Sequence, residues 1–111
     1  MKIINKTKNI VLHSNTKIAK TKKEKMRGLL DALETDAMLF DTRWGIHTFG
    51  MKFPIDCAIC DDSGLIQIIK KDIKPSKMFF WNPKYKRVFE LPAGTLERTQ
   101  TEIGDYIHCE D

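Results

Sequence analysis

The chain has 111 residues, of which 41% are hydrophobic and 31% charged, and its formal net charge is +4. This length predicts a single domain over residues 1–111 with a small core, and the short apolar runs exclude a membrane-spanning helix. The first residues lack the apolar segment and cleavage site of an export signal. Three cysteines is an odd number without framework spacing, so we expect a cytoplasmic protein in a reducing compartment.

The charge is unevenly distributed along the chain. Residues 1–27 carry nine Lys/Arg and one acid, and residues 70–87 carry seven and one. Residues 31–62 and 88–111 are acidic. Such blocks either form opposed charged faces or interleave in space and cancel. The second outcome is the more common, because charged runs mostly just solvate a surface.

The N-terminal third predicts strands followed by a helix. Residues 3–19 predict two short strands around a polar turn at residues 13–15. Thr21 and Glu24 then have the spacing of a capping box, which predicts a helix over residues 22–33. An apolar stripe with helical spacing should face the core; it consists of Met26, Leu29, Leu30 and Leu33.

The rest of the chain predicts short strands. They cover residues 37–41, 55–60, 65–70, 86–92 and 105–110, with β-compatible residues at 42–53. A turn of Asp-Asp-Ser-Gly makes a hairpin of the second and third strands. Residues 71–85, with two prolines, predict an irregular loop, and residues 93–104 are rich in turn formers. We therefore expect a mainly β, compact sandwich or barrel-like fold with one short helix near residues 22–33.

Cys57 and Cys60 have the C-x-x-C spacing of redox and metal sites. In a strand, however, residues three apart point to opposite faces and their Cα atoms are about 10 Å apart, too far for a disulfide. No second ligand pair for zinc is present in the sequence. The two cysteines are therefore interpreted as small buried hydrophobes, and no metal or cofactor is expected.

Six segments together resemble the domain-of-unknown-function 192 family, a prokaryotic group without an assigned activity. They are "GLL" at 28–30, "AMLF" at 37–40, "HTFGMKFPID" at 47–56, "DSGLI" at 62–66, "ELPAGT" at 90–95 and "GDYI" at 104–107. The resemblance covers about residues 10–108 and implies a small mainly β domain with a short helix. Family members usually have aliphatic residues where Cys57 and Cys60 stand, which supports a core position for both.

Asp56 stands at the start of an apolar strand, where a carboxylate needs a partner. On one interpretation it accepts hydrogen bonds from backbone N–H groups and holds the turn at residues 50–54. On the other it binds a ligand or acts as an acid or base, and Glu90 poses the same choice. If the two carboxyls faced one cleft, their pKa values would be split.

His47 is either a general base or a half-buried, hydrogen-bonded strand residue. The candidate catalytic residues are therefore Asp56, Glu90 and His47, without a recognisable triad or nucleophile motif. The candidate ligand-binding residues are His47, Thr48, Met51, Asp56, Glu90 and Trp81.

The stretch from Met78 to Trp81 places four large apolar residues among lysines and prolines. It either caps one end of the core or forms a recognition surface for single-stranded nucleic acid or an anionic partner. Three functions follow, in order of preference. The first is a binding or accessory domain for a small molecule or protein, with a pocket near residues 47–56 and Glu90. The second is a small hydrolase-like enzyme, and the third is nucleic-acid binding through residues 74–87. The sequence leaves the oligomeric state open.

Overall fold

The computed structural model describes residues 1–21 and 33–111. The helix predicted over residues 22–33, with most of its apolar stripe, falls on residues outside this description. Its last residue, Leu33, is described and is 71% exposed, so the prediction that it faces the core is wrong. Ten strands and one short helix are described: β1 (Lys2–Asn5), β2 (Ile10–His13), β3 (Thr16–Ile18), β4 (Ala37–Asp41), β5 (Gly45–His47), β6 (Ile55–Cys60), β7 (Ile66–Ile73), β8 (Met78–Phe80), β9 (Arg87–Pro92), α2 (Thr95–Arg98) and β10 (Ile107–Glu110). The prediction of a mainly β fold is confirmed.

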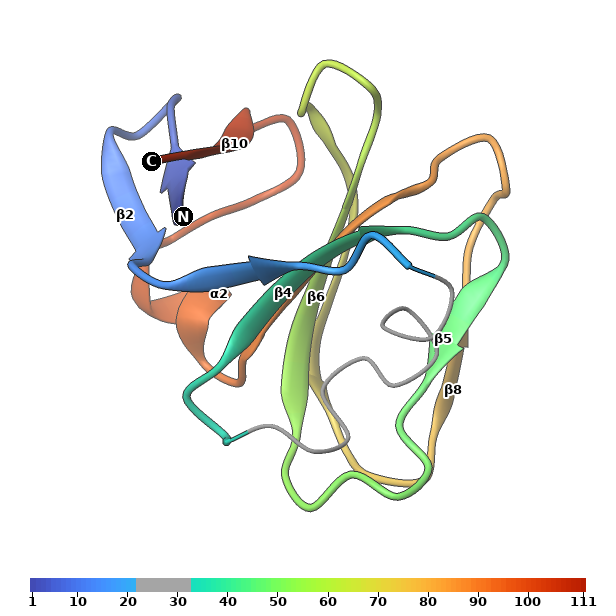
Figure 1. Cartoon of the computed structure of the whole chain (residues 1–111). Coiled ribbons are helices and arrows are strands. Elements are labelled where there is room, and N and C mark those ends of the chain that lie inside the picture. Colours follow the sequence, from blue (N-terminus) through green and yellow to red (C-terminus); the bar gives the residue numbers. More distant parts are fainter. Residues whose placement is uncertain (22–32) are drawn as a thin grey trace.

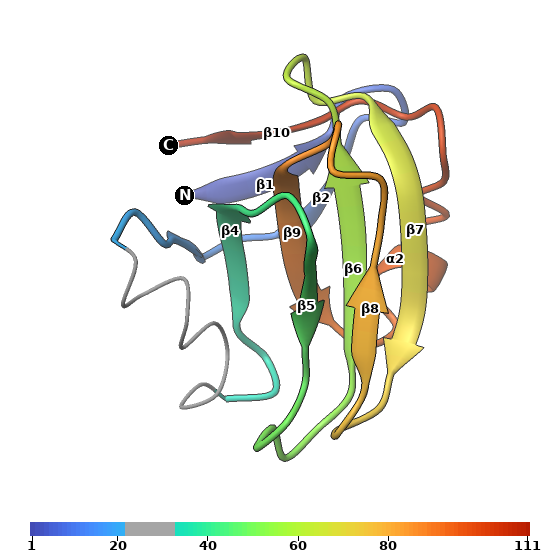
Figure 2. The ribbon, with the colours of Figure 1, turned by 90° about the vertical axis from the view of Figure 1, so that its right-hand side faces the viewer.

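A five-stranded sheet in the order β3-β4-β9-β6-β7 forms the centre of the fold. Its strands are antiparallel except β3, which pairs with β4 in parallel. A three-stranded sheet, β10-β1-β2, and the helix α2 lie on one side of it (Figure 1). A two-stranded ribbon of β5 and β8 lies on the other side, in front of the central sheet in Figure 2. No helix among the described residues is long and apolar enough to cross a membrane.

The central sheet separates two hydrophobic cores. One lies toward the ribbon and includes Phe40, Cys57, Val88 and Trp81. The other lies toward the three-stranded sheet and α2 and includes Ile3, Ala58, Cys60, Phe89 and Leu96. Every residue of β6 is buried because both of its faces are covered, as is usual for a strand inside a sandwich.

Three local predictions are wrong. Residues 3–19 form three strands rather than two, because a turn at residues 6–9, with Asn9 in the left-handed region, makes a hairpin of β1 and β2. The expected loop at residues 71–85 contains the end of β7 and all of β8. The turn-rich segment at residues 93–104 contains α2, whose residues Thr95 and Leu96 are buried.

A buried polar network joins the β1–β2 hairpin to the C-terminal part of the chain. The side-chain amide of Asn5 donates to Asp105 Oδ2 (2.9 Å) and to Thr101 Oγ1 (3.1 Å). Its carbonyl oxygen accepts a hydrogen bond from the backbone N–H of Lys8 (3.0 Å). The Asn5 side chain thus makes three hydrogen bonds, two to the C-terminal part of the chain and one within its own turn.

We expect Asn5→Ala to lower the free energy of unfolding by about 2 kcal/mol, because the buried Asn5 amide loses three hydrogen bonds and the N–H of Lys8 loses its acceptor. Urea denaturation followed by circular dichroism measures this change. Asn15→Ala, at an exposed position in the next turn, is the control and should shift the midpoint little. Equal shifts for the two variants would contradict the role assigned to the network.

Candidate functional site

Asp56 is 1% exposed and both of its carboxylate oxygens are bonded to backbone. Oδ1 accepts a hydrogen bond from the N–H of Asp72 (2.9 Å), and Oδ2 accepts one from the N–H of Leu96 (3.0 Å). Asp72 has φ 54 and lies where the β6–β7 register shifts, and Leu96 is in the first turn of α2. Asp56 therefore joins a bulge in β7 to α2, and its donors are not those of the turn at residues 50–54.

Glu90 lies on the opposite face of the central sheet. It is directly across from Cys57 on β6 and from Met38 on β4, both of which belong to the core beneath the ribbon. Asp56 is across from Leu91, in the other core. Directly opposed residues share a face of a sheet. The structure therefore separates the two carboxyls, and they form no pair.

The carboxyl of Glu90 is 3% exposed, and its Oε1 atom is buried without a hydrogen-bond partner. Burial raises the pKa of this carboxyl to about 7, because a charged carboxylate is poorly solvated in an apolar core. The group is therefore a neutral acid over much of the acidic range. It is the one described buried side chain whose polar atom is left unsatisfied.

His47 joins neither carboxyl. Its side chain is exposed on β5, and its ring stacks on Phe49 with centroids 5.3 Å apart and an interplanar angle of 26°. The backbone N–H of Phe49 donates to His47 Nδ1 (3.3 Å). Asp56, Glu90 and His47 thus occupy three different surroundings, and the expected catalytic constellation does not assemble.

The side chains of the other three predicted ligand-binding residues make hydrogen bonds or core contacts within the fold. The Thr48 hydroxyl donates to the carbonyl of Lys74 (2.6 Å) and accepts from the N–H of Lys77 (2.9 Å), which ties the segment that leaves β5 to the segment that enters β8 at one end of the ribbon. Met51 and Trp81 are buried in the core beneath the ribbon. The indole N–H of Trp81 donates to the carbonyl of Tyr85 (2.7 Å).

Cys57 and Cys60 lie in the two different cores and are not joined in a disulfide. The interpretation of opposite strand faces is confirmed. Burial raises the pKa of the Cys57 thiol well above its usual value and that of Cys60 to about 12. Both thiols therefore stay protonated at neutral pH, which does not favour nucleophilic or metal chemistry. Among the described residues, no group of three or more His, Cys, Asp or Glu side chains could hold a metal.

The ribbon, in contrast, presents large apolar side chains to solvent. We define the ribbon face as Trp44, His47, Phe49, Met78 and Phe80. The exposed fractions are 71% for Trp44, 62% for Phe80, 58% for Met78 and 47% for Phe49. His47 pairs with Met78, and Gly45 pairs with Phe80, so these positions share the outer side of the ribbon. Ile46 and Phe79 point inward and pack on the core.

Of the ribbon face, only His47 is a candidate site residue in the sequence, whereas Met78 and Phe80 are expected in a loop that either caps the core or forms a recognition surface. Trp44 and Phe49 were missed. The sequence feature that indicates this surface is the run from Met78 to Trp81. In a strand, successive side chains point to opposite sides, so Met78 and Phe80 point outward while Phe79 and Trp81 point inward.

The segments that form the ribbon carry charges of one sign. Residues 42–54 and 74–86, which form the ribbon and its connections to the central sheet, contain six basic residues and no Asp or Glu. These are Arg43, Lys52, Lys74, Lys77, Lys84 and Lys86. Within the described part of the chain, Lys74 alone among them makes an ion pair, with Asp72. The ribbon and its connections are therefore basic.

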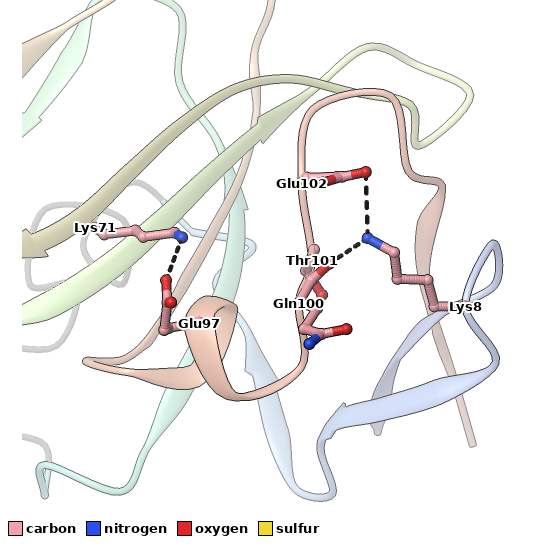
Figure 3. Close-up of a pocket in the computed structure, with 6 residues that line it drawn as sticks. All are labelled: Lys8, Lys71, Glu97, Gln100, Thr101 and Glu102. Atoms are coloured by element: carbon pink, nitrogen blue, oxygen red, sulfur yellow. Dashed lines mark hydrogen bonds and ion pairs between the residues drawn. The ribbon is translucent and has the colours of Figure 1, made fainter.

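Neither of two surface hollows lined by described residues contains a predicted site residue. One, of about 430 Å³, is polar and is shown in Figure 3. Its charges are already paired, Lys71 with Glu97 (2.7 Å) and Lys8 with Glu102 (3.5 Å). The other, of about 350 Å³, lies along β3 and β4 and includes Lys20, Asp41 and Arg87. The ribbon face is thus the better candidate for a functional surface.

Comparisons with known proteins identify the family of this chain. The profile of a family described as "Uncharacterized ACR" (DUF192) matches residues 3–109. A "UPF0127 protein" of Thermococcus sibiricus is 32% identical over 115 residues, which cover 97% of this chain and 74% of that protein.

Two crystal structures are similar in fold. One is a protein of unknown function from Novosphingobium aromaticivorans, with a TM-score of 0.82, 16% identity and coverage of 98% of this chain and 84% of that one. The other, from Sinorhizobium meliloti, is described as a candidate transcription regulator. It has a TM-score of 0.75, 20% identity and coverage of 96% and 89%. At these identities the similarity shows the fold alone.

Proposed function

The chain belongs to the uncharacterised DUF192 family, and on that premise we propose that it is a binding domain whose contact surface is the ribbon face. The observation that carries this proposal is the group of four large apolar side chains exposed on and beside one two-stranded ribbon. Exposed apolar residues gathered on one surface are typical of interaction sites. Aromatic residues and Met are also enriched where proteins contact partners.

The ribbon is well suited to hold such a surface in place. Phe79 and Trp81 anchor its inner side in the core, and the hydroxyl of Thr48 joins its two connecting turns. A contact surface on a rigid element loses less conformational entropy on binding than one on a loop. These contacts support binding by the ribbon in its present conformation.

The hydrolase function is less well supported. No observation favours a hydrolase, because Asp56, Glu90 and His47 do not come together. A pocket shared by residues 47–56 and Glu90 is also not supported, since Asp56 is bonded to backbone on the far side of the sheet. We therefore keep the hypothesis of a binding domain and propose the ribbon face as its contact surface in place of this pocket.

The proposal can be tested without knowing the partner. Immobilised wild type and the immobilised double variant Trp44→Ser/Phe80→Ser are compared for the molecules that each retains. Protein and nucleic acid retained from an extract of the source organism are both identified and quantified. We expect at least a tenfold loss of the retained partner, since central aromatic residues contribute about 2 kcal/mol or more each at interfaces. Tyr106→Ser is the matched control, because Tyr106 is a 46% exposed aromatic residue outside the ribbon. Equal capture by all three proteins would refute the proposal.

A further inference from the structure

The ring of Phe80 lies directly over Gly45. A Cβ atom added at Gly45 would be 2.7 Å from Phe80 Cδ1 and 2.5 Å from the carbonyl oxygen of Phe79. Only a residue without a side chain therefore lets the Phe80 ring pack against the neighbouring strand in this way. The ring is nevertheless 62% exposed. Phe80 is thus supported from below and open to solvent, as a stacking platform must be.

A second aromatic surface stands on β5, two residues after Gly45. His47 and Phe49 stack on each other, and both are exposed. Their rings lie close to parallel, at 26°, and Trp44 precedes the strand with 71% of its surface exposed. Flat unsaturated rings spaced along an open β surface are what unpaired nucleobases stack on in proteins that bind single strands.

The basic residues of the ribbon segments favour a negatively charged partner. The two segments that form the ribbon and its connections carry six Lys/Arg and no acid. Lys52 and Lys77 are exposed and stand at the turns that lead out of β5 and into β8. A chain of phosphates would neutralise such a surface and release counterions.

From these observations we propose that the partner of the ribbon face is a single-stranded nucleic acid. In this arrangement its bases stack on Phe80 and on the His47–Phe49 pair, and its phosphates contact the lysines beside them. The inference rests on the proposed function, and it names the class of partner. Duplex DNA fits less well, because a ribbon in the major groove reads base edges with polar side chains, and the ribbon face is mainly apolar. An anionic membrane fits less well, because interfacial binding typically uses an amphipathic helix.

The test uses fluorescence anisotropy with a labelled oligothymidylate of about 15 nucleotides, a length that spans one small domain. A matched oligomer of abasic nucleotides carries the same phosphates without bases, so the ratio of the two Kd values isolates stacking. We expect the wild type to bind the oligothymidylate at least about fivefold more tightly than the abasic oligomer. This ratio should fall toward one in Phe80→Ala and stay unchanged in Tyr106→Ala.

The phosphate contacts are tested by salt dependence. Lys77→Gln should reduce the slope of log Kd against log salt by about 0.7, the value for one phosphate contact with a single strand. Lys6→Gln removes the same charge from the β1–β2 turn and should leave the slope unchanged. Equal effects of the two substitutions would show that only overall charge matters, which would overturn the proposal.

Three other outcomes would also overturn it. They are no saturable binding of the oligothymidylate, equal binding of the abasic oligomer, and Phe80-dependent sedimentation with phosphatidylglycerol vesicles in place of oligonucleotide binding. If one of these outcomes occurs but Trp44→Ser/Phe80→Ser retains less partner from extract than the wild type does, the binding domain stands and the nucleic acid is wrong. If that capture also fails, both proposals are wrong.

Discussion

Replacing Asp56 with alanine should lower the free energy of unfolding by about 4 kcal/mol, because it removes the acceptor of two backbone N–H groups. Those donors, on Asp72 and Leu96, belong to a bulge in β7 and to the first turn of α2. Each buried donor left without an acceptor costs about 1–3 kcal/mol. Since the whole domain is expected to have about 5–15 kcal/mol of stability, Asp56→Ala should be close to unfolding at physiological temperature.

Thermal and urea unfolding of Asp56→Ala and Asp56→Asn measure this effect. The asparagine keeps one acceptor oxygen and places its amide N–H₂ against the other donor, so it should recover less than half of the loss. Asp62→Ala is the matched control, because Asp62 is an exposed acid in the β6–β7 turn and its substitution should change stability by less than about 0.5 kcal/mol. An Asp56→Ala protein as stable as this control would show that the fold does not need the carboxylate.

The position of Asp56 illustrates what the sequence can and cannot predict. An acid at the start of an apolar strand predicted a bonded carboxylate, and its carboxylate is bonded. The donors could not be predicted, because they come from residues 16 and 40 positions away, which only the strand register brings together. The supposed pairing of Asp56 and Glu90 depended on the same register. A shift of one residue exchanges the faces of a strand, so sequence alone could not separate the two carboxyls.

The ribbon was missed for a different reason. Pro75 and Pro83 flank Met78–Phe80 and read as signals of an irregular loop, and a three-residue strand is too short for a reliable period-two pattern. The hairpin of β6 and β7 and the placement of Cys57 and Cys60 on opposite faces were predictable, because a six-residue strand fixes the alternation. Long strands are therefore readable from this sequence, whereas the short partner that carries the exposed aromatics is not.

Glu90 should make the protein less stable as the pH rises from about 4.5 to about 7. The folded pKa is raised to about 7, from 4.5 for an ordinary Glu, so in this window the folded state binds more protons than the unfolded state. Stability then falls with increasing pH and levels off above the folded pKa. The full loss is about 3 kcal/mol, from 1.36 kcal/mol per pKa unit. It is absent below the unfolded pKa, where the carboxyl is protonated in both states.

The difference between the urea stability curves of wild type and Glu90→Gln isolates this titration from those of all other groups. At about pH 8 the neutral variant should be more stable than wild type by about 3 kcal/mol, and at about pH 4 the two should differ by less than 1 kcal/mol. Glu34→Gln removes an exposed carboxylate and should follow the wild-type curve. A constant difference at every pH would instead mean that Glu90 ionises normally. Because Glu90 lies in the core beneath the ribbon and not on the ribbon face, its substitution should change stability without changing partner binding, the reverse of what Phe80→Ala should do.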